Sequence, residues 1–182
     1  APSFKIEQLA LRADKTLRRG TLTADVGTNE ISSDTQSRRD PLLDLAWNRS
    51  LATRSTLGIT AAQGFTGSGD VGLGGSAIVT TAPFEQKSVG ISYGLAAERT
   101  NVTLRVNAGE EDYAGGTALD NDYRSSSVTI SYRVSTRLDF GFRYEQYDRE
   151  FQDTTVTFTS QADWTSGLWL NRTFGRRFSV AL

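Results

Sequence analysis

Residues 127–145 read SVTISYRVSTRLDFGFRYE, and this stretch decides the fold. Apolar side chains fall on every second position before and after a short basic turn at 133–137. A period of two is typical of a β-strand with one apolar face, and two such runs across a short turn predict an antiparallel β-hairpin. The apolar positions are Val128, Ile130, Tyr132, Leu138, Phe140, Phe142 and Tyr144.

Similar short basic turns recur along the chain. The clearest lie at 48–54, 132–137 and 171–177, with looser versions at 14–19 and 98–101. They recur roughly every 35 to 48 residues, which is the length of a large hairpin. Long loops rich in glycine and acidic residues lie between them. Short turns at one end and long loops at the other are typical of a transmembrane β-barrel.

The composition is compatible with such a barrel. The chain has 182 residues, of which 37% are hydrophobic, it lacks cysteine and histidine, and its mean hydropathy is −0.38. Only alternate strand residues of a barrel face lipid, so a modest hydropathy is expected. The sequence has no apolar run of about 18 residues, which excludes a transmembrane helix. The formal net charge of −1 gives no broad basic field for nucleic acid.

Alternation in the rest of the chain predicts about ten strands in one antiparallel up-and-down barrel. At the start, Phe4 and Ile6 share one parity whereas Leu9 and Leu11 share the other, which predicts a β-bulge. Near the end, one parity persists over 154–172. A strand of that length predicts a hairpin that projects beyond the membrane.

A soluble β-sandwich or β-barrel is the alternative architecture, because its strands alternate in the same way. Three features favour the membrane, and the first is the segregation of short turns and long loops to opposite ends of the strands. The polar faces hold mostly Gly, Ser and Thr, with little Lys or Glu, unlike a surface that faces bulk water. Large aromatic residues gather near strand ends, where a membrane barrel has its interfacial girdle. The girdle candidates are Trp47, Tyr93, Tyr132, Tyr144 and Trp164.

If the apolar parity faces lipid, the polar parity faces the lumen. Charges of both signs in a lumen favour the passage of polar solutes. In a closed barrel of about ten strands, however, side chains nearly fill the interior, and the same charges form a salt-bridge network that blocks conduction. A channel and a plugged barrel are therefore both open. The lumen-lining candidates are Asp25, Asp44, Asn48, Arg105, Asn107, Arg133, Asp139, Arg143 and Glu145.

The sequence predicts no enzyme activity, no cofactor and no metal centre. The lack of histidine removes the His-dependent hydrolase mechanisms. Asp139 and Glu145 share a face, but the arginines around them favour a ladder of lumen charges over an acid–base pair. Asp120 and Asp122, in one long acidic loop, are weak candidates for calcium binding or for cation bridges to lipopolysaccharide. A solvated acidic loop is the stronger interpretation.

The repeated turns, in which Arg follows Asn or Tyr and a second Arg comes a few residues later, resemble those of Gram-negative outer-membrane β-barrels. Together with the long acidic loops, they resemble in particular the porin-type barrels associated with exopolysaccharide export. The resemblance implies an outer-membrane location, short turns in the periplasm and long acidic loops outside the cell. The chain departs from this group because it is shorter, and because it ends on Val180-Ala181-Leu182 instead of an aromatic residue.

We therefore expect one outer-membrane barrel domain over residues 1–182, either whole or part of a larger barrel. The expected role is a porin-like channel for polar solutes or a saccharide. The alternative is a non-conducting barrel with a structural or surface-interaction role. The expected partners are outer-membrane lipid and lipopolysaccharide, a polar solute or polysaccharide, and other envelope proteins, but not nucleic acid.

Overall fold

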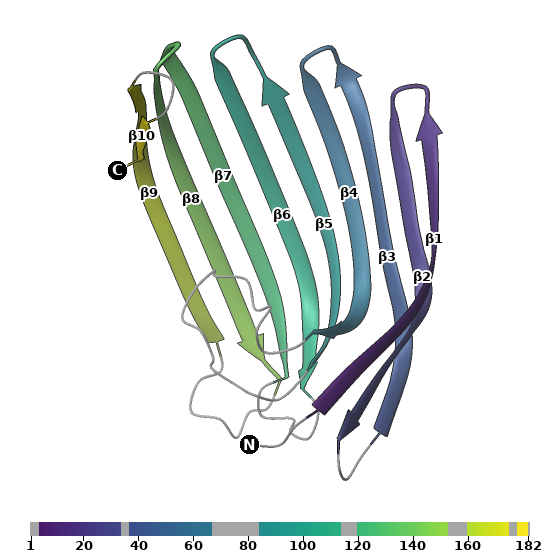
Figure 1. Ribbon diagram of the computed structural model, residues 1–182. Helices are drawn as coiled ribbons and strands as arrows, with labels where there is room; N and C mark the ends of the chain where they lie inside the picture. The colour runs from purple at the N-terminus through teal and green to yellow at the C-terminus, as the bar shows by residue number, and fades with distance from the viewer. Residues whose placement is uncertain are drawn as a thin grey trace.

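The structure is a computed structural model that describes residues 4–33, 37–66, 84–113, 120–152, 160–174 and 178–181. These residues form one ten-stranded sheet in which each strand pairs with its neighbours in the sequence (Figure 1). Every pairing is antiparallel. The predicted all-β, antiparallel, up-and-down sheet of about ten strands is confirmed.

Nine of the strands have 12 to 16 residues, whereas β10 has four. Among the described residues, no helix is long and apolar enough to cross a membrane. The strands are β1 Phe4–Leu17, β2 Gly20–Ser33, β3 Ser37–Ala52, β4 Ser55–Thr66, β5 Phe84–Ala96, β6 Thr100–Tyr113, β7 Asn121–Ser135, β8 Leu138–Phe151, β9 Ser160–Phe174 and β10 Phe178–Ala181.

Short turns join the strands at one end of the sheet, and each contains an arginine. They lie at 18–19, 53–54, 97–99 and 136–137, close to the predicted positions. Backbone hydrogen bonds of 2.7 Å fasten each of the first three turns to the following hairpin. The donor and acceptor pairs are Ser50 N–H to Arg19 O, Ala96 N–H to Arg54 O and Arg133 N–H to Arg99 O.

The predicted bulge in the first strand is wrong. The pairing of β1 with β2 runs from Phe4↔Ser33 to Leu17↔Gly20 without a shift in register. Ile6 pairs with Ile31, which is buried. Both side chains lie on the face of the sheet opposite to Leu9 and Leu11. The apolar residues of β1 change parity because this opposite face is covered at that end of the strand. Register shifts occur instead beside two short turns, at Ser50/Ala52 and at Arg133/Ser135.

The predicted long strand at 154–172 is only partly described. β9 has 15 residues, the same length as β7, so the described part of this hairpin is no longer than its neighbours. The tip of this hairpin is expected near Glu150 to Asp153, and the segment 153–159 lies outside the described residues.

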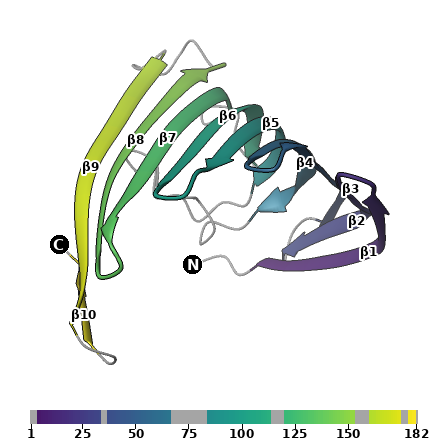
Figure 2. The same ribbon diagram turned by 90° about the horizontal axis from the view of Figure 1, so that it is seen from above.

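The sheet curls into an open arc with β1 at one edge and β9 and β10 at the other (Figure 2). In the described residues β1 pairs only with β2, and β10 pairs only with β9. The predicted closed barrel therefore differs from the observed sheet, which has two free edges. The four residues of β10 offer few backbone groups to the fourteen residues of β1.

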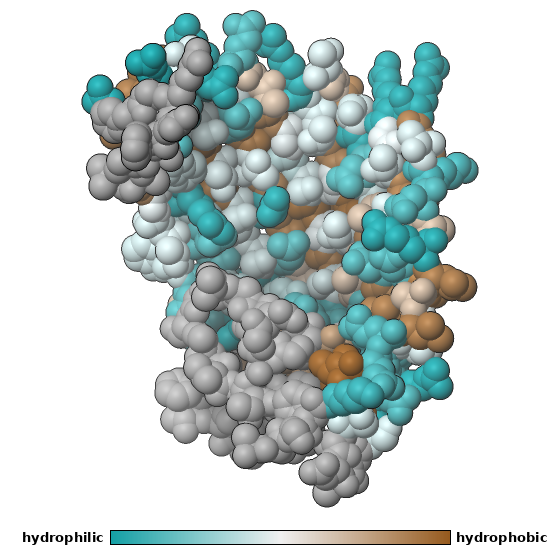
Figure 3. Space-filling model, in the orientation of Figure 1, coloured by the Kyte–Doolittle hydropathy of each residue, from teal (hydrophilic) through white to brown (hydrophobic). Residues whose placement is uncertain are grey.

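The concave face of the arc carries small side chains and glycines because neighbouring side chains converge there. A Cβ atom at Gly90 would lie 2.3 Å from the Asn107 Oδ1, and one at Gly58 would lie 2.4 Å from the Ser92 Oγ. Glycine at these positions makes room for the curvature. Figure 3 looks onto this concave face, where white and teal side chains predominate across the middle of the sheet.

Candidate functional site

The convex face carries a continuous apolar belt that crosses nine strands. Paired residues share a face, so the register places these side chains together. Leu11, Val89 and Leu168 keep 83%, 60% and 67% of their surface exposed. The belt consists of Leu9, Leu11, Ala13, Leu22, Ala24, Val26, Leu43, Leu45, Trp47, Leu57, Ile59, Ala61, Val89, Ile91, Tyr93, Leu95, Val102, Leu104, Val106, Ala108, Val128, Ile130, Tyr132, Leu138, Phe140, Phe142, Tyr144, Ala162, Trp164, Leu168 and Leu170.

The register also fixes how the short turns are arranged across the sheet. One row of paired residues runs through Gly20, Arg49, Leu57, Tyr93, Leu104, Val128 and Tyr144. Strand β2 begins on this row, at Gly20. Strands β4, β6 and β8, which follow the next three short turns, begin progressively further from the row. Ser55 lies two residues before Leu57, Thr100 four before Leu104, and Leu138 six before Tyr144.

The short-turn end therefore shifts by one residue for each strand crossed. At about 3.3 Å per residue and about 4.8 Å between strands, this shift is an inclination of about 35°. The belt shifts in the same direction. The paired row through Ala24, in the middle of the belt on β2, reaches β8 at Asp148, whereas the belt on β8 is centred near Gly141. Belt and turns are thus inclined together.

All five predicted girdle residues lie on the convex face within the belt. Trp47 and Tyr132 lie toward the short turns of their strands, and Trp164 lies toward the long connections of β9. Trp164 is 70% exposed. A row of paired residues joins Trp47 to Trp164. Because the belt is inclined to such rows, Trp47 lies near the short-turn border of the belt and Trp164 lies near its opposite border. Their role at a membrane interface remains a prediction.

All nine predicted lumen-lining residues lie on the concave face, because each occupies the parity opposite to the belt. Arg133 lies 3.6 Å from Asp139, and Arg143 pairs with Glu145 on the same strand. Asn107 donates to the Ser125 hydroxyl at 3.2 Å. The remaining candidates, Asp25, Asp44, Asn48 and Arg105, are distributed over β2, β3 and β6.

Sequence reasoning missed Arg12, although its parity assigns it to the same face. Arg12 Nε lies 3.1 Å from Asp14 and 3.9 Å from Asp25, and Asp25 pairs across the strands with Asp44. The concave face therefore has an acidic group of three carboxylates around one arginine on β1 to β3. The arginines 105, 133 and 143 lie on β6 to β8, on the other side of the arc.

A second missed group fills the concave face near the long connections. Glu111 is buried and accepts hydrogen bonds from the Tyr113 hydroxyl at 3.2 Å, the Asn121 amide at 3.2 Å and the Tyr147 hydroxyl at 3.4 Å. The Arg149 guanidinium lies 4.6 Å from the centre of the Tyr147 ring. We call these five residues the Glu111 cluster. Burial, together with the charge of Glu111, raises the pKa of Tyr113 to about 12.

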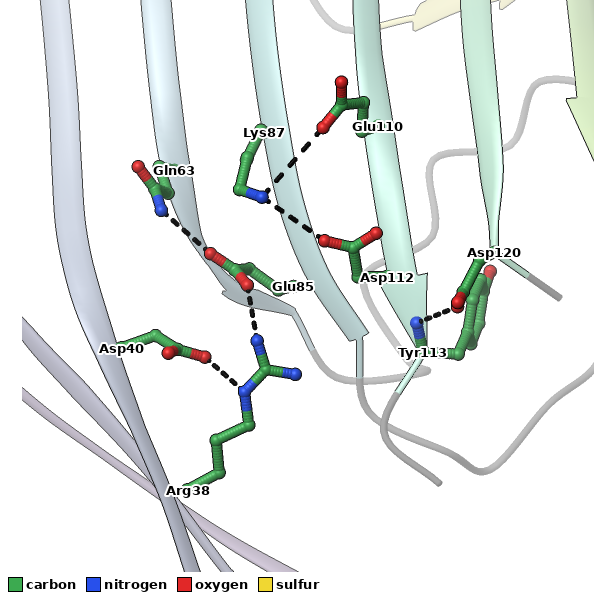
Figure 4. A network of polar contacts seen from close by, with 9 residues as sticks. All are labelled: Arg38, Asp40, Gln63, Glu85, Lys87, Glu110, Asp112, Tyr113 and Asp120. Atoms are coloured by element: carbon green, nitrogen blue, oxygen red, sulfur yellow. Dashed lines mark hydrogen bonds and ion pairs between the residues drawn. The ribbon is translucent and has the colours of Figure 1, made fainter. Parts of the chain in front are cut away.

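A third group joins β3 to β5 where β3 and β4 separate (Figure 4). Arg38 contacts Asp40 at 2.6 Å and the buried carboxylate of Glu85 at 2.8 Å, and Glu85 also accepts from Gln63 at 2.8 Å. The Arg38 guanidinium lies 5.4 Å from the centre of the Phe65 ring. No local sequence signal identifies this contact, because Arg38 and Glu85 are 47 residues apart.

The two weak calcium candidates have different roles in the structure. Asp120 accepts a 2.7 Å hydrogen bond from the backbone N–H of Tyr113 (Figure 4). Asp122 is exposed and pairs across the strands with Glu110, beside Lys87. In the described part of the chain, no group of three or more acidic residues is arranged to hold a metal ion.

The arrangement thus combines an exposed apolar convex face with a polar, partly charged concave face. Such a sheet can divide an apolar phase from water, and it offers charged groups to a polar molecule on its concave side. The chain matches no family model, no curated protein and no solved structure.

Proposed function

We propose that the sheet is the wall of a β-barrel in the outer membrane of a Gram-negative bacterium and that the barrel conducts polar solutes. The observation that carries this proposal is the joint inclination of the apolar belt and the short turns. Strands of outer-membrane barrels tilt by about 35–45° from the membrane normal. When the strands tilt by about 35°, belt and turns both become parallel to the plane of a bilayer.

The dimensions of the belt support the same placement. It spans six residue steps on β5, from Val89 to Leu95, and eight on β9, from Ala162 to Leu170. At about 3.3 Å per residue and a tilt of about 35°, these lengths correspond to about 16–22 Å along the membrane normal. The apolar band of outer-membrane barrels is about 25 Å tall. The belt at its longest therefore comes within about 3 Å of that height.

A soluble fold is less compatible with the faces. A soluble curved sheet buries its apolar side chains on the inside, whereas here the apolar side chains lie on the convex face and remain exposed. In aqueous solution, a second apolar layer would be needed to cover the convex face. Lipid acyl chains fulfil the same need over the whole belt, and the concave charges then face the aqueous lumen.

Closure of the barrel is part of the proposal. Free backbone groups at a sheet edge cost several kcal/mol each in lipid, so both edges must be paired within the membrane. Strand β10 runs opposite to β9 and therefore also opposite to β1. The two edges have the directions that an antiparallel closure needs, and the number of strands in the closed barrel sets the width of its lumen.

A non-conducting barrel is the second candidate, and the Glu111 cluster favours it. This cluster fills the concave face at one end, and several lumen charges are already paired. Single-channel recording in planar bilayers separates the two functions. A conducting barrel should give discrete current steps, and Arg105→Ser should shift the reversal potential toward cation selectivity. A correctly folded protein that gives no steps would contradict the channel and leave the structural role.

A further inference from the structure

A hollow of about 480 Å³ lies at the turn between β1 and β2. Three arginines, Arg18, Arg19 and Arg49, line this hollow beside the apolar belt. Register places Leu17, Trp47 and Arg49 on the convex face, and Arg18 and Arg19 form the turn above them. Gly20 and Asn48 complete the lining, which includes no carboxylate.

The three guanidinium groups of this hollow have no ion-pair partner within the described ranges of the chain. The turn at 53–54 differs in this respect, because Arg54 pairs with Glu98 at 3.3 Å. Arg99 and Arg137 in the two remaining short turns also have no ion pair among the described residues, but each lies without a second arginine in its turn. Three like charges around one hollow repel one another, so an anion that enters it removes an unfavourable interaction.

The backbone holds this group of arginines in place. The Ser50 N–H donates to the Arg19 carbonyl at 2.7 Å and so fastens the turn to β3. Gly20 allows the close approach, because a Cβ atom there would lie 1.9 Å from the Asn48 carbonyl oxygen. The backbone of the turn that carries Arg18 and Arg19 is therefore kept beside Arg49.

We propose that this hollow binds the phosphate of an anionic glycerophospholipid in the leaflet at the short-turn end. The proposal rests on the proposed membrane location. Guanidinium groups bind phosphate oxygens in pairs of hydrogen bonds, and three of them surround the hollow. Trp47 and Leu17 provide the apolar and interfacial contacts for the glycerol and the first acyl carbons. The ligand is a lipid and not a free anion because the arginines border the belt directly.

The test uses the full chain in detergent micelles, with phosphatidylglycerol as the probe and native mass spectrometry as the readout of bound lipid. The first variant is Arg18→Gln combined with Arg49→Gln. The matched control is Arg99→Gln combined with Arg137→Gln, which removes the same charge from the short turns at 97–99 and 136–137. All four side chains are exposed, so both variants should fold as the wild type does.

Each basic residue near an anionic headgroup contributes roughly a fivefold gain in affinity, so the first variant should bind phosphatidylglycerol about 25-fold more weakly. The control should stay within about twofold of the wild type. Equal weakening in both variants, or no weakening in either, would overturn the site. Inorganic phosphate should not displace the lipid at equal concentration; displacement would mean that the hollow binds free phosphate instead.

The outcome also separates this site from the proposed function. A protein that inserts into bilayers and conducts, but whose first variant binds lipid like the wild type, contradicts only the lipid site. A protein that does not enter bilayers at all contradicts both proposals.

Discussion

A charge placed in the middle of the belt tests whether the convex face contacts lipid. Val106 lies on β6 within the belt and keeps 59% of its surface exposed. The change Val106→Arg places a guanidinium on the convex face. The matched control is Thr103→Arg on the same strand. Thr103 lies on the concave face opposite Gly94, which has no side chain to obstruct the arginine.

The two environments predict different magnitudes. An arginine at the lipid face near the bilayer midplane costs about 2–4 kcal/mol, which is roughly a 30- to 900-fold change in the folding equilibrium. If the convex face contacts water instead, Val106→Arg removes only the partial burial of the valine side chain. The free energy of unfolding would then fall by less than about 1 kcal/mol. Thr103→Arg should cost less than about 1 kcal/mol in a water-filled lumen.

The assay is urea-induced unfolding of the protein folded into phospholipid vesicles, followed by tryptophan fluorescence. The wild type and the two variants are compared under the same conditions. A loss of at least about 2 kcal/mol for Val106→Arg, with a small loss for Thr103→Arg, fits the proposal. A larger loss for the concave variant, or no loss for the convex one, would refute the assignment of the faces.

Two further predictions concern the concave face. Gly141→Ala should destabilise the fold by about 1–3 kcal/mol in urea unfolding, because its Cβ would lie 2.0 Å from the Trp169 ring. Gly167→Ala, where no atom lies within 4 Å, should be neutral or stabilising, and equal effects would contradict the packing. The buried Tyr113 phenol, with its pKa raised to about 12, stabilises the fold fully below pH 10 and loses this contribution as the pH rises toward 12. Tyr113→Phe should therefore lose less stability than the wild type over that interval, and an equal loss would contradict the burial of the phenol.

The periodicity of the sequence was sufficient to predict the hairpins and the two faces. The run from Val128 to Tyr144 alternates strictly because one side of the strands is apolar along its whole length. Short-turn positions followed from clusters of basic and turn-forming residues, which lie where the register places the ends of the strands. Parity alone separated the lumen candidates from the girdle candidates, because successive side chains of a strand point to opposite faces.

Features that depend on distant parts of the chain could not be predicted in this way. The parity change at Ile6 suggested a bulge, but its cause is the burial of Ile31 on a partner strand. The contact of Arg38 with Glu85 and the gathering of side chains around Glu111 depend on where strands separate or curve. The described sheet has free edges because β1 and β10 do not pair with each other, and a local period of two does not encode whether opposite ends of the chain pair.

The most direct test of the central claim is the accessibility of two neighbouring positions on β7. Ser131 lies on the concave face and Ile130 on the convex belt, and the chain has no native cysteine to interfere. Single variants Ser131→Cys and Ile130→Cys, each folded into phospholipid vesicles, are treated with a charged, water-soluble thiol reagent. We predict that Ser131→Cys reacts and that Ile130→Cys is protected until detergent removes the lipid. Equal reaction at both positions in intact vesicles, or protection of Ser131→Cys alone, would contradict a lipid-facing convex belt.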